Sequence, residues 1–246
     1  MVKSSLRSMA VLLLCTFPSL APEAGAQASP WSAEASLGWD IGLSGDFLAA
    51  GIGTLNGVPV VFQSQPFDDV YGNGVLLQFS GGYRVDDINE VRAQVSYQNV
   101  GADVVNLGTA GAFDLVGTFD DYQAWSIEAA GRHYFAPSTE RWRSYAGATV
   151  GVSIISEIDG VLASGQAGLE RYVTDLYDGT AALTLGVNGG VLYMLNDRFD
   201  LNGQLGFRYN SGLSAIDALA GTGLEDVNDK SSRWTMPLTF GIRMKF

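Results

Sequence analysis

The chain has 246 residues, of which 47% are hydrophobic, 16% are charged and 31 are glycine. This composition indicates a folded, β-rich protein, because so many glycines disfavour a helical one. The formal net charge of −12 argues against a nucleic-acid partner, which is bound through clustered lysine and arginine.

The N-terminal segment has the pattern of a cleaved signal peptide. A basic start precedes an apolar run from Met9 to Leu20, which is too short to span a bilayer, and the small residues of AGAQA follow. We place the cleavage after Ala28, with Ala26 as the alternative. Cys15 is the only cysteine, so the exported domain, residues 29–246, is expected to lack thiols and disulfides.

Alternation of apolar and polar residues begins at Trp31. In WSAEASLGWDIGL every odd-numbered residue is apolar and every even-numbered one is glycine or polar, as in a strand with two different faces. The pattern returns seven times, and several repeats have the nine to eleven residues or more that cross a bilayer at a tilt. The eight predicted strands cover residues 31–43, 75–85, 91–98, 123–135, 142–154, 180–195, 199–210 and 233–246.

The connections between these strands alternate in length. DDINE, APSTER and NDR are short and polar, whereas residues 45–74, 99–122, 155–179 and 211–232 form long connections. Such long connections are unusual in a compact soluble domain but typical of a membrane barrel. The sequence therefore predicts an all-β fold, an eight-stranded antiparallel up-and-down transmembrane β-barrel with short periplasmic turns and four long extracellular loops.

Two of the long connections contain further predicted structure. Asn56-Gly57, in LNGVPVVF, is a strong hairpin signal and is expected to extend the barrel wall above the membrane. The stretches SGQAGLERYVTDLYD and SAIDALAG are expected to form short helices.

The apolar face of the predicted strands carries no Asp, Glu, Lys or Arg, as a lipid-facing wall requires. Its aromatic residues gather near the strand ends, which predicts two interfacial girdles. The periplasmic girdle would contain Trp31, Tyr83, Phe135, Trp142, Tyr193, Phe199 and Phe246, and the outer girdle Tyr97, Trp125, Tyr209 and Trp234.

The last strand ends in FGIRMKF and contains Pro237, which cannot donate a ladder hydrogen bond, so we expect a bulge or a missing bond there. In strand number, loop rhythm and aromatic end, the chain resembles the small eight-stranded outer-membrane proteins of Gram-negative bacteria. This porin-like family includes the OmpA transmembrane domain, OmpX, OmpW and the opacity proteins. The resemblance implies an outer-membrane location and a C-terminal signal for the barrel-insertion machinery, formed by Phe240, Ile242, Met244 and Phe246.

The polar face of the strands carries many charges that would point into the barrel. The predicted lumen charge network consists of Glu34, Asp40, Arg84, Arg92, Glu128, Arg132, Arg143, Asp200, Arg208 and Arg243, with Arg233 and Lys245 also inward. An eight-stranded barrel is just wide enough for side chains to fill, and buried charges must be paired. We interpret the network as a polar plug. The alternative is a narrow anion-preferring channel for small solutes, because basic residues are in excess at one end.

The long loops are acidic. Acids precede the descending strands at Asp68, Asp69, Asp120, Asp121, Asp175, Asp178, Glu225, Asp226 and Asp229. One interpretation is a weak cation collar that binds lipopolysaccharide through Ca²⁺ or Mg²⁺, since oxygen-rich clusters suit these ions. The other is that the acids simply keep the loops solvated. No EF-hand spacing is present, and no cofactor is expected.

His133 is the only histidine and is placed by the pattern at the periplasmic end of a strand. No Gly-x-Ser-x-Gly motif or metal-binding triad accompanies it, so the sequence predicts a non-enzyme. The predicted function is structural or surface interaction, with the small-solute channel as the alternative.

Overall fold

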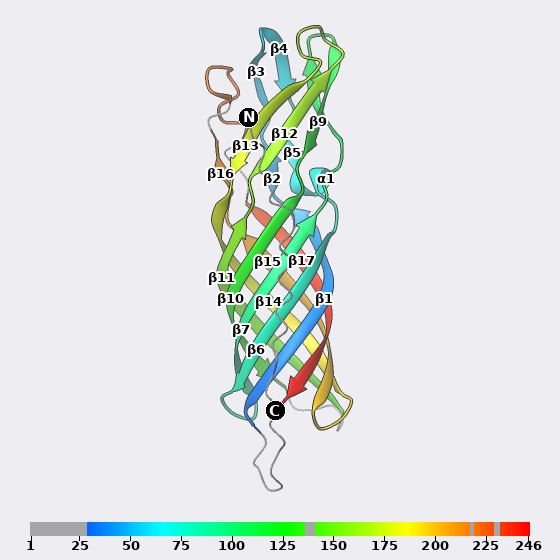
Figure 1. The fold of residues 1–246 in the computed structure, drawn as a ribbon, viewed down its shortest axis with the longest axis vertical. Coiled ribbons are helices and arrows are strands. Elements are labelled where there is room, and N and C mark those ends of the chain that lie inside the picture. The colour runs from blue at the N-terminus through cyan, green and yellow to red at the C-terminus, as the bar shows by residue number, and fades with distance from the viewer. Residues whose placement is uncertain (1–28, 136–140, 217–218, 229–231) are drawn as a thin grey trace, which may run out of the picture.

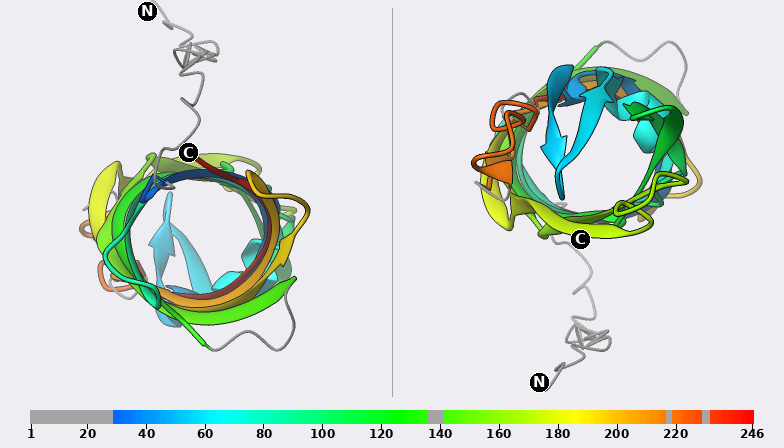
Figure 2. Two further views of the ribbon diagram at one scale, coloured as in Figure 1. Left: turned by 90° about the horizontal axis from the view of Figure 1, so that it is seen from below. Right: turned by 90° about the horizontal axis from the view of Figure 1, so that it is seen from above.

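The computed structural model describes residues 29–135, 141–216, 219–228 and 232–246. Within these residues, eight long strands form a closed antiparallel barrel (Figures 1 and 2), as predicted from the alternation. The predicted signal peptide lies outside the described residues. The barrel strands are β1 (Trp31–Ser44), β6 (Gly74–Arg84), β7 (Asn89–Val100), β10 (Tyr122–Tyr134), β11 (Trp142–Ile155), β14 (Thr180–Met194), β15 (Phe199–Asn210) and β17 (Arg233–Lys245).

The barrel closes by pairing its first strand with its last. Around the wall the order is β1-β17-β15-β14-β11-β10-β7-β6, and β1 pairs with β17 from Ser32 opposite Lys245 to Ser44 opposite Trp234. The start of β1, the end of β17 and the short connections β6–β7 and β14–β15 lie at one end of the barrel, which we call the periplasmic end (Figure 1). The long connections lie at the other end, which we call the external end.

Pro237 interrupts the ladder on one side, as expected. The pairing of β17 with β1 continues through Asp40 opposite Pro237, but on the other side it stops after Leu205 opposite Leu238. It resumes at Arg208 opposite Thr235. The local loss of pairing therefore lies between β15 and β17, where a proline has no N–H to donate.

The four long connections are organised into sheet rather than irregular loops. Within the described residues they form a seven-stranded sheet, in the order β16-β13-β12-β9-β8-β4-β3, which we call the external sheet (Figure 1). Its strands are β3 (Gly51–Leu55), β4 (Val58–Phe62), β8 (Val105–Ala110), β9 (Phe113–Phe119), β12 (Ile158–Ser164), β13 (Tyr172–Asp178) and β16 (Ser214–Ala215). The short strands β2 (Asp46–Leu48) and β5 (Gln65–Pro66) pair beneath it.

The hairpin predicted at Asn56-Gly57 is confirmed. Both residues have positive φ, 50° and 78°, and connect β3 to β4. This is the conformation that a tight two-residue hairpin requires and that Asn-Gly adopts readily.

The helix predicted in SGQAGLERYVTDLYD is wrong, because Tyr172–Asp178 forms strand β13. Pairing with β12 provides hydrogen bonds for its backbone, and its side chains Thr174, Leu176 and Tyr177 are buried. In SAIDALAG, Ser214–Ala215 forms strand β16, and residues 217–218 lie outside the described part. The helix α1 (Phe67–Val70) has four residues. In the described residues, no helix is long and apolar enough to cross a membrane.

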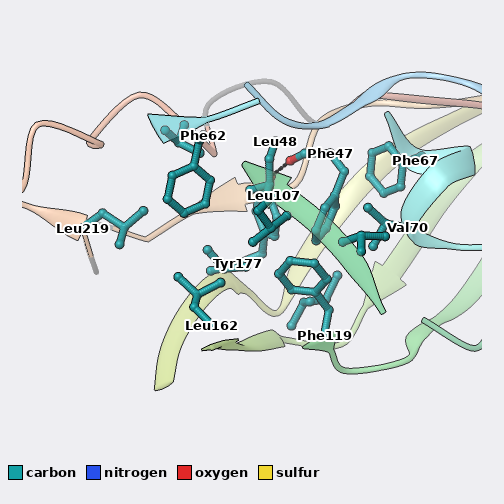
Figure 3. Close-up of a cluster of buried hydrophobic side chains, with 14 of the residues drawn as sticks. Phe47, Leu48, Phe62, Phe67, Val70, Leu107, Phe119, Leu162, Tyr177 and Leu219 are labelled. Carbon is teal, nitrogen blue, oxygen red and sulfur yellow. Dashed lines mark hydrogen bonds between the residues drawn. The ribbon is translucent and has the colours of Figure 1, made fainter. Parts of the chain in front are cut away.

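The space enclosed by the external sheet is filled with apolar side chains, which we call the outer core (Figure 3). Phe47, on β2, is fully buried at its centre and meets the rings of Phe67, Tyr71, Phe119 and Tyr177 at centroid distances of 5.0–5.4 Å. The Tyr177 hydroxyl donates a hydrogen bond to the Phe47 carbonyl oxygen. The molecule therefore has a polar interior within the barrel and an apolar interior above it.

Candidate functional site: the barrel lumen and its two ends

The predicted lumen charges are gathered into layers of buried ion pairs. One layer centres on Glu34 of β1, whose carboxylate accepts from both terminal nitrogens of Arg132 at 3.0 and 3.1 Å and lies 3.0 Å from a terminal nitrogen of Arg92. Asn202 donates a further hydrogen bond to Glu34 at 2.7 Å. Strand β1 is thus joined across the lumen to β7, β10 and β15, none of which is its neighbour in the wall.

A second layer lies nearer the periplasmic end and centres on Glu90. This carboxylate pairs with Arg243 at 2.7 Å and with Arg92 at 3.3 Å, and it accepts hydrogen bonds from the hydroxyls of Ser32 and Tyr134. Glu90 was not among the predicted lumen residues, because the third strand was predicted to begin at residue 91. Glu90 is in phase with the inward Arg92, so extending the alternation by one residue would have identified it.

Toward the external end two more acids pair with arginines. Glu128 accepts from Arg208 at 3.1 Å and from Gln94 at 2.7 Å. Asp40, which is fully buried, accepts a hydrogen bond from Gln98, and Arg233 lies 3.9 Å away. A cavity of about 20 Å³, lined in part by Gln94, Gln204 and Arg208, has room for roughly one water molecule.

Above Asp40 the lumen meets the outer core. The Arg233 guanidinium is buried and its Cζ lies 4.7 Å from the centroid of the Tyr122 ring and 5.8 Å from that of Phe67. Tyr71 packs beside both rings, and its hydroxyl donates to the Asp120 carbonyl oxygen at 2.9 Å. Burial raises the pKa of the Tyr71 hydroxyl, so this tyrosine stays neutral at physiological pH. Aromatic side chains and Arg233 therefore cover the external end of the lumen.

The periplasmic end is different, because it opens into a cavity of about 410 Å³, which we call the periplasmic pocket. Its lining residues are Arg84, Asp87, Arg141, Trp142, Arg143, Leu192, Met194, Asp200, Arg243 and Lys245. Two residues of the predicted network, Arg84 and Arg143, lie here rather than in the ion-pair layers. Asp200 lies here too and pairs with Lys245 at 2.8 Å.

The outward face of the barrel exposes a continuous belt of large apolar side chains. Phe79, Trp125 and Ile127, for example, are 60%, 56% and 62% exposed. Aromatic residues pair across strands at both margins of the belt, with Trp31 against Tyr83 at the periplasmic margin and Tyr209 against Trp234 at the outer one. Exposure of such a surface to water is unfavourable, whereas contact with lipid is favourable, and closure of the barrel removes free sheet edges from the bilayer. The fold is that of a small outer-membrane β-barrel.

Comparisons with solved structures give low-identity likenesses over most of the chain. Neisserial surface protein A is 18% identical, with a TM-score of 0.45, over 90% of this chain and 100% of that one. OprG of Pseudomonas aeruginosa is 17% identical, with a TM-score of 0.47, over 89% and 97%. The protease OmpT of Escherichia coli is 11% identical, with a TM-score of 0.41, over 90% and 99%. No protein-family model and no curated protein matches the chain.

The acids of the predicted collar are exposed on the outside of the external sheet and its connections. They are Asp68, Asp69, Asp120, Asp121, Asp175, Asp178, Glu225 and Asp226, while Asp229 lies outside the described residues. Of these acids, Asp120 and Asp175 adjoin Asp159, which sequence analysis did not single out. Within the described part of the chain, no three His, Cys, Asp or Glu residues are arranged to hold a metal ion.

Asp159 and Asp175 form a cross-strand pair of like charges on β12 and β13. Burial, followed by the charges of Asp175, Asp120 and Glu157, raises the pKa of the Asp159 carboxyl above its usual range. This part of the external surface is therefore electrostatically strained at neutral pH, because directly opposed like charges destabilise a sheet.

His133 lies on the outside of the barrel at the periplasmic end. Its Nδ1 is 3.0 Å from Asn89 Oδ1, and its ring meets the edge of Phe135. Both contacts fit an interfacial residue, as its position in the sequence suggested.

Proposed function

We propose that this protein is a non-conducting outer-membrane barrel that holds a rigid β-sheet above the membrane for interactions at the cell surface. The observation that carries the proposal is the outer core. Long connections in a barrel need no buried core of their own, and the entropy of ordering them must be offset by burial. Here they bury Phe47, Phe67, Phe119, Tyr122 and Tyr177 together, which favours a fixed external structure.

The filled lumen supports the non-conducting part of the proposal. An ion that passed through would have to separate Glu34 from Arg132, Glu128 from Arg208 and Asp40 from Arg233 in turn. Each step would leave a buried charge uncompensated, which costs several kcal/mol, on the order of 3–5 for a broken pair. The aromatic cover over Arg233 adds an apolar barrier at the external end.

We further propose that the protein has no enzymatic activity. A histidine that served as the base of an external hydrolase would lie near the external end, whereas His133 lies at the periplasmic end, outside the lumen and against Asn89.

Planar-bilayer recording tests the conductance. The wild-type barrel is expected to be silent, and so is a variant lacking residues 49–64, because the ion-pair layers lie below that segment. Discrete, anion-selective conductance of the wild type would overturn the non-conducting role and favour the small-solute channel.

Attachment assays test the surface role. Bacteria that display the wild type are compared with bacteria that display a barrel whose long connections are replaced by short Gly-Ser turns. We expect the shortened barrel to assemble but to lose cell–cell and cell–surface attachment. Equal attachment at equal surface amounts would contradict the surface role and leave a purely structural barrel.

A further inference from the structure

The periplasmic pocket has no part in the proposed surface function. Its net charge is positive, whereas that of the whole chain is negative. The chain carries a formal net charge of −12. The pocket is lined by five basic residues (Arg84, Arg141, Arg143, Arg243, Lys245) and two acidic ones (Asp87, Asp200), a balance of +5 − 2 = +3. Such a concentration of cations in a concave site favours an anion.

The acidic residues form ion pairs with only some of these cations. Arg243 pairs with Glu90, and Lys245 pairs with Asp200. Among the described residues, no salt bridge reaches Arg84, Arg141 or Arg143. Arg141 contacts the Tyr193 hydroxyl at 3.5 Å, and Arg143 donates to the Asp87 carbonyl oxygen.

Some N–H donors of these arginines have no hydrogen-bond acceptor in the pocket wall. The Nε atoms of Arg84 and Arg143 are buried and have no hydrogen-bond acceptor in the described structure. The Arg143 guanidinium is nevertheless held in place, because its Cζ lies 4.6 Å from the centroid of the Tyr134 ring. A guanidinium fixed by a ring keeps its fork of donors oriented, which lowers the entropic cost of binding an oxyanion.

The pocket wall also has an apolar part. Leu192, which lines the pocket, is buried against Tyr134 and Tyr145. Arg243 lines the pocket too, and its guanidinium pairs with Glu90 in the lumen. A ligand in the pocket would therefore meet both cations and an apolar surface.

We propose that the periplasmic pocket binds a small organic phosphate. A volume of about 410 Å³ falls in the range of small-molecule sites, roughly 300–1,000 Å³, and exceeds what a bare ion needs. A phosphate monoester carries close to two charges and three acceptor oxygens, which suits Arg84 and Arg143 with Arg141 nearby. Leu192 and Met194 would contact its organic part. The phosphate would come from a soluble metabolite as a monoester, or from a phospholipid headgroup of the inner leaflet as a diester, which carries one charge and two free acceptor oxygens.

Calorimetry on the refolded full-length barrel tests the proposal. In zwitterionic detergent the probe is glycerol 3-phosphate, and in lipid nanodiscs phosphatidylglycerol is compared with phosphatidylcholine by thermal stability. The test variant is Arg84→Gln/Arg143→Gln. The matched control is Arg198→Gln, which removes an exposed arginine at the same end outside the pocket. Heat-modified gel mobility confirms that each variant is folded, and single Arg84→Gln replaces the double variant if the latter does not fold.

We expect wild type and Arg198→Gln to bind the probe alike, and the pocket variant to bind at least about tenfold more weakly, because two charge-assisted contacts are lost. Binding of glycerol 3-phosphate in detergent supports the soluble source. Stabilisation by phosphatidylglycerol alone, lost in the pocket variant, supports the headgroup. The proposal is overturned if neither ligand acts, if the pocket variant binds normally, or if Arg198→Gln weakens binding equally. None of these outcomes bears on the surface role, which depends on the external sheet.

Discussion

Glu34 and Arg132 face each other across the lumen, with the carboxylate of one bonded to both ends of the guanidinium of the other at 3.0 and 3.1 Å. Glu34 lies on β1 and Arg132 on β10, and two strands, β6 and β7, separate them around the wall. The pair therefore braces the barrel internally in addition to the ladder hydrogen bonds. Arg92 also reaches Glu34, so one carboxylate compensates two buried cations.

Replacing Glu34 with glutamine should destabilise the barrel strongly. Glutamine keeps the shape but leaves the buried Arg132 without its ion pair, and breaking a buried pair in this way costs about 3–5 kcal/mol. Urea unfolding in lipid vesicles, followed by tryptophan fluorescence, measures the loss. The matched control is Asp200→Asn. This substitution should cost less than Glu34→Gln, because the partner Lys245 is 22% exposed and can be hydrated. Equal losses for the two variants would show that Glu34 is not a brace.

Replacing Phe47 with alanine should loosen the external sheet without unfolding the barrel. The ring is fully buried among four aromatic neighbours, and removal of such a ring costs about 3–5 kcal/mol. We expect faster proteolysis of the external connections and unchanged heat-modified mobility of the barrel. Phe113→Ala, at a half-exposed ring on β9, is the control and should leave proteolysis unchanged. Intact protection in Phe47→Ala would mean that the outer core does not stabilise the sheet.

The external sheet should become more stable in mild acid. The pKa of Asp159 is raised in the folded protein, so its folded state binds a proton more tightly than its unfolded state. The stabilisation from protonation is full below the ordinary aspartate pKa and is lost as pH rises through the raised value. Proteolysis of the connection between β12 and β13 should therefore slow between pH 7 and pH 4.5. Asp159→Asn should remove this dependence and protect the connection at pH 7, whereas an unchanged pH profile would contradict the assignment.

The barrel could be predicted from the sequence because lipid and lumen impose opposite demands on alternate residues. Trp31 to Leu43 alternates without exception, and its strand ends one residue beyond the predicted range. The external sheet could not be predicted in the same way. In β13, Leu176 and Tyr177 are adjacent and both buried, so the alternation is broken and the segment looked helical.

The aromatic cover of the lumen was not predicted either, because acidic residues adjoin the aromatic ones in the sequence. FDDVY and FDDYQ were noted for their exposed acids, yet Phe67, Tyr71, Phe119 and Tyr122 are the residues that turn inward. Their partners, Phe47 and Tyr177, come from other connections, and no local pattern relates segments so distant in sequence. The partners in the ion pairs could not be predicted from a local pattern either. Inward charges were identifiable by phase, but which acid meets which arginine depends on the barrel register.

A charge placed on the apolar belt should test the membrane location directly. Val150 on β11 is 50% exposed and pairs with Ala129, which lies midway between Trp125 and His133 on β10. Arginine at this depth should cost about 2–4 kcal/mol, because the guanidinium must reach the interface or draw water into the bilayer. Val104→Arg is the control, since Val104 is 69% exposed but lies in the external connection after β7. Unfolding in lipid vesicles should show a large loss for Val150→Arg and none for Val104→Arg. If instead both variants were as stable as the wild type, the belt would face water, and the exposed apolar wall would need a different partner from lipid.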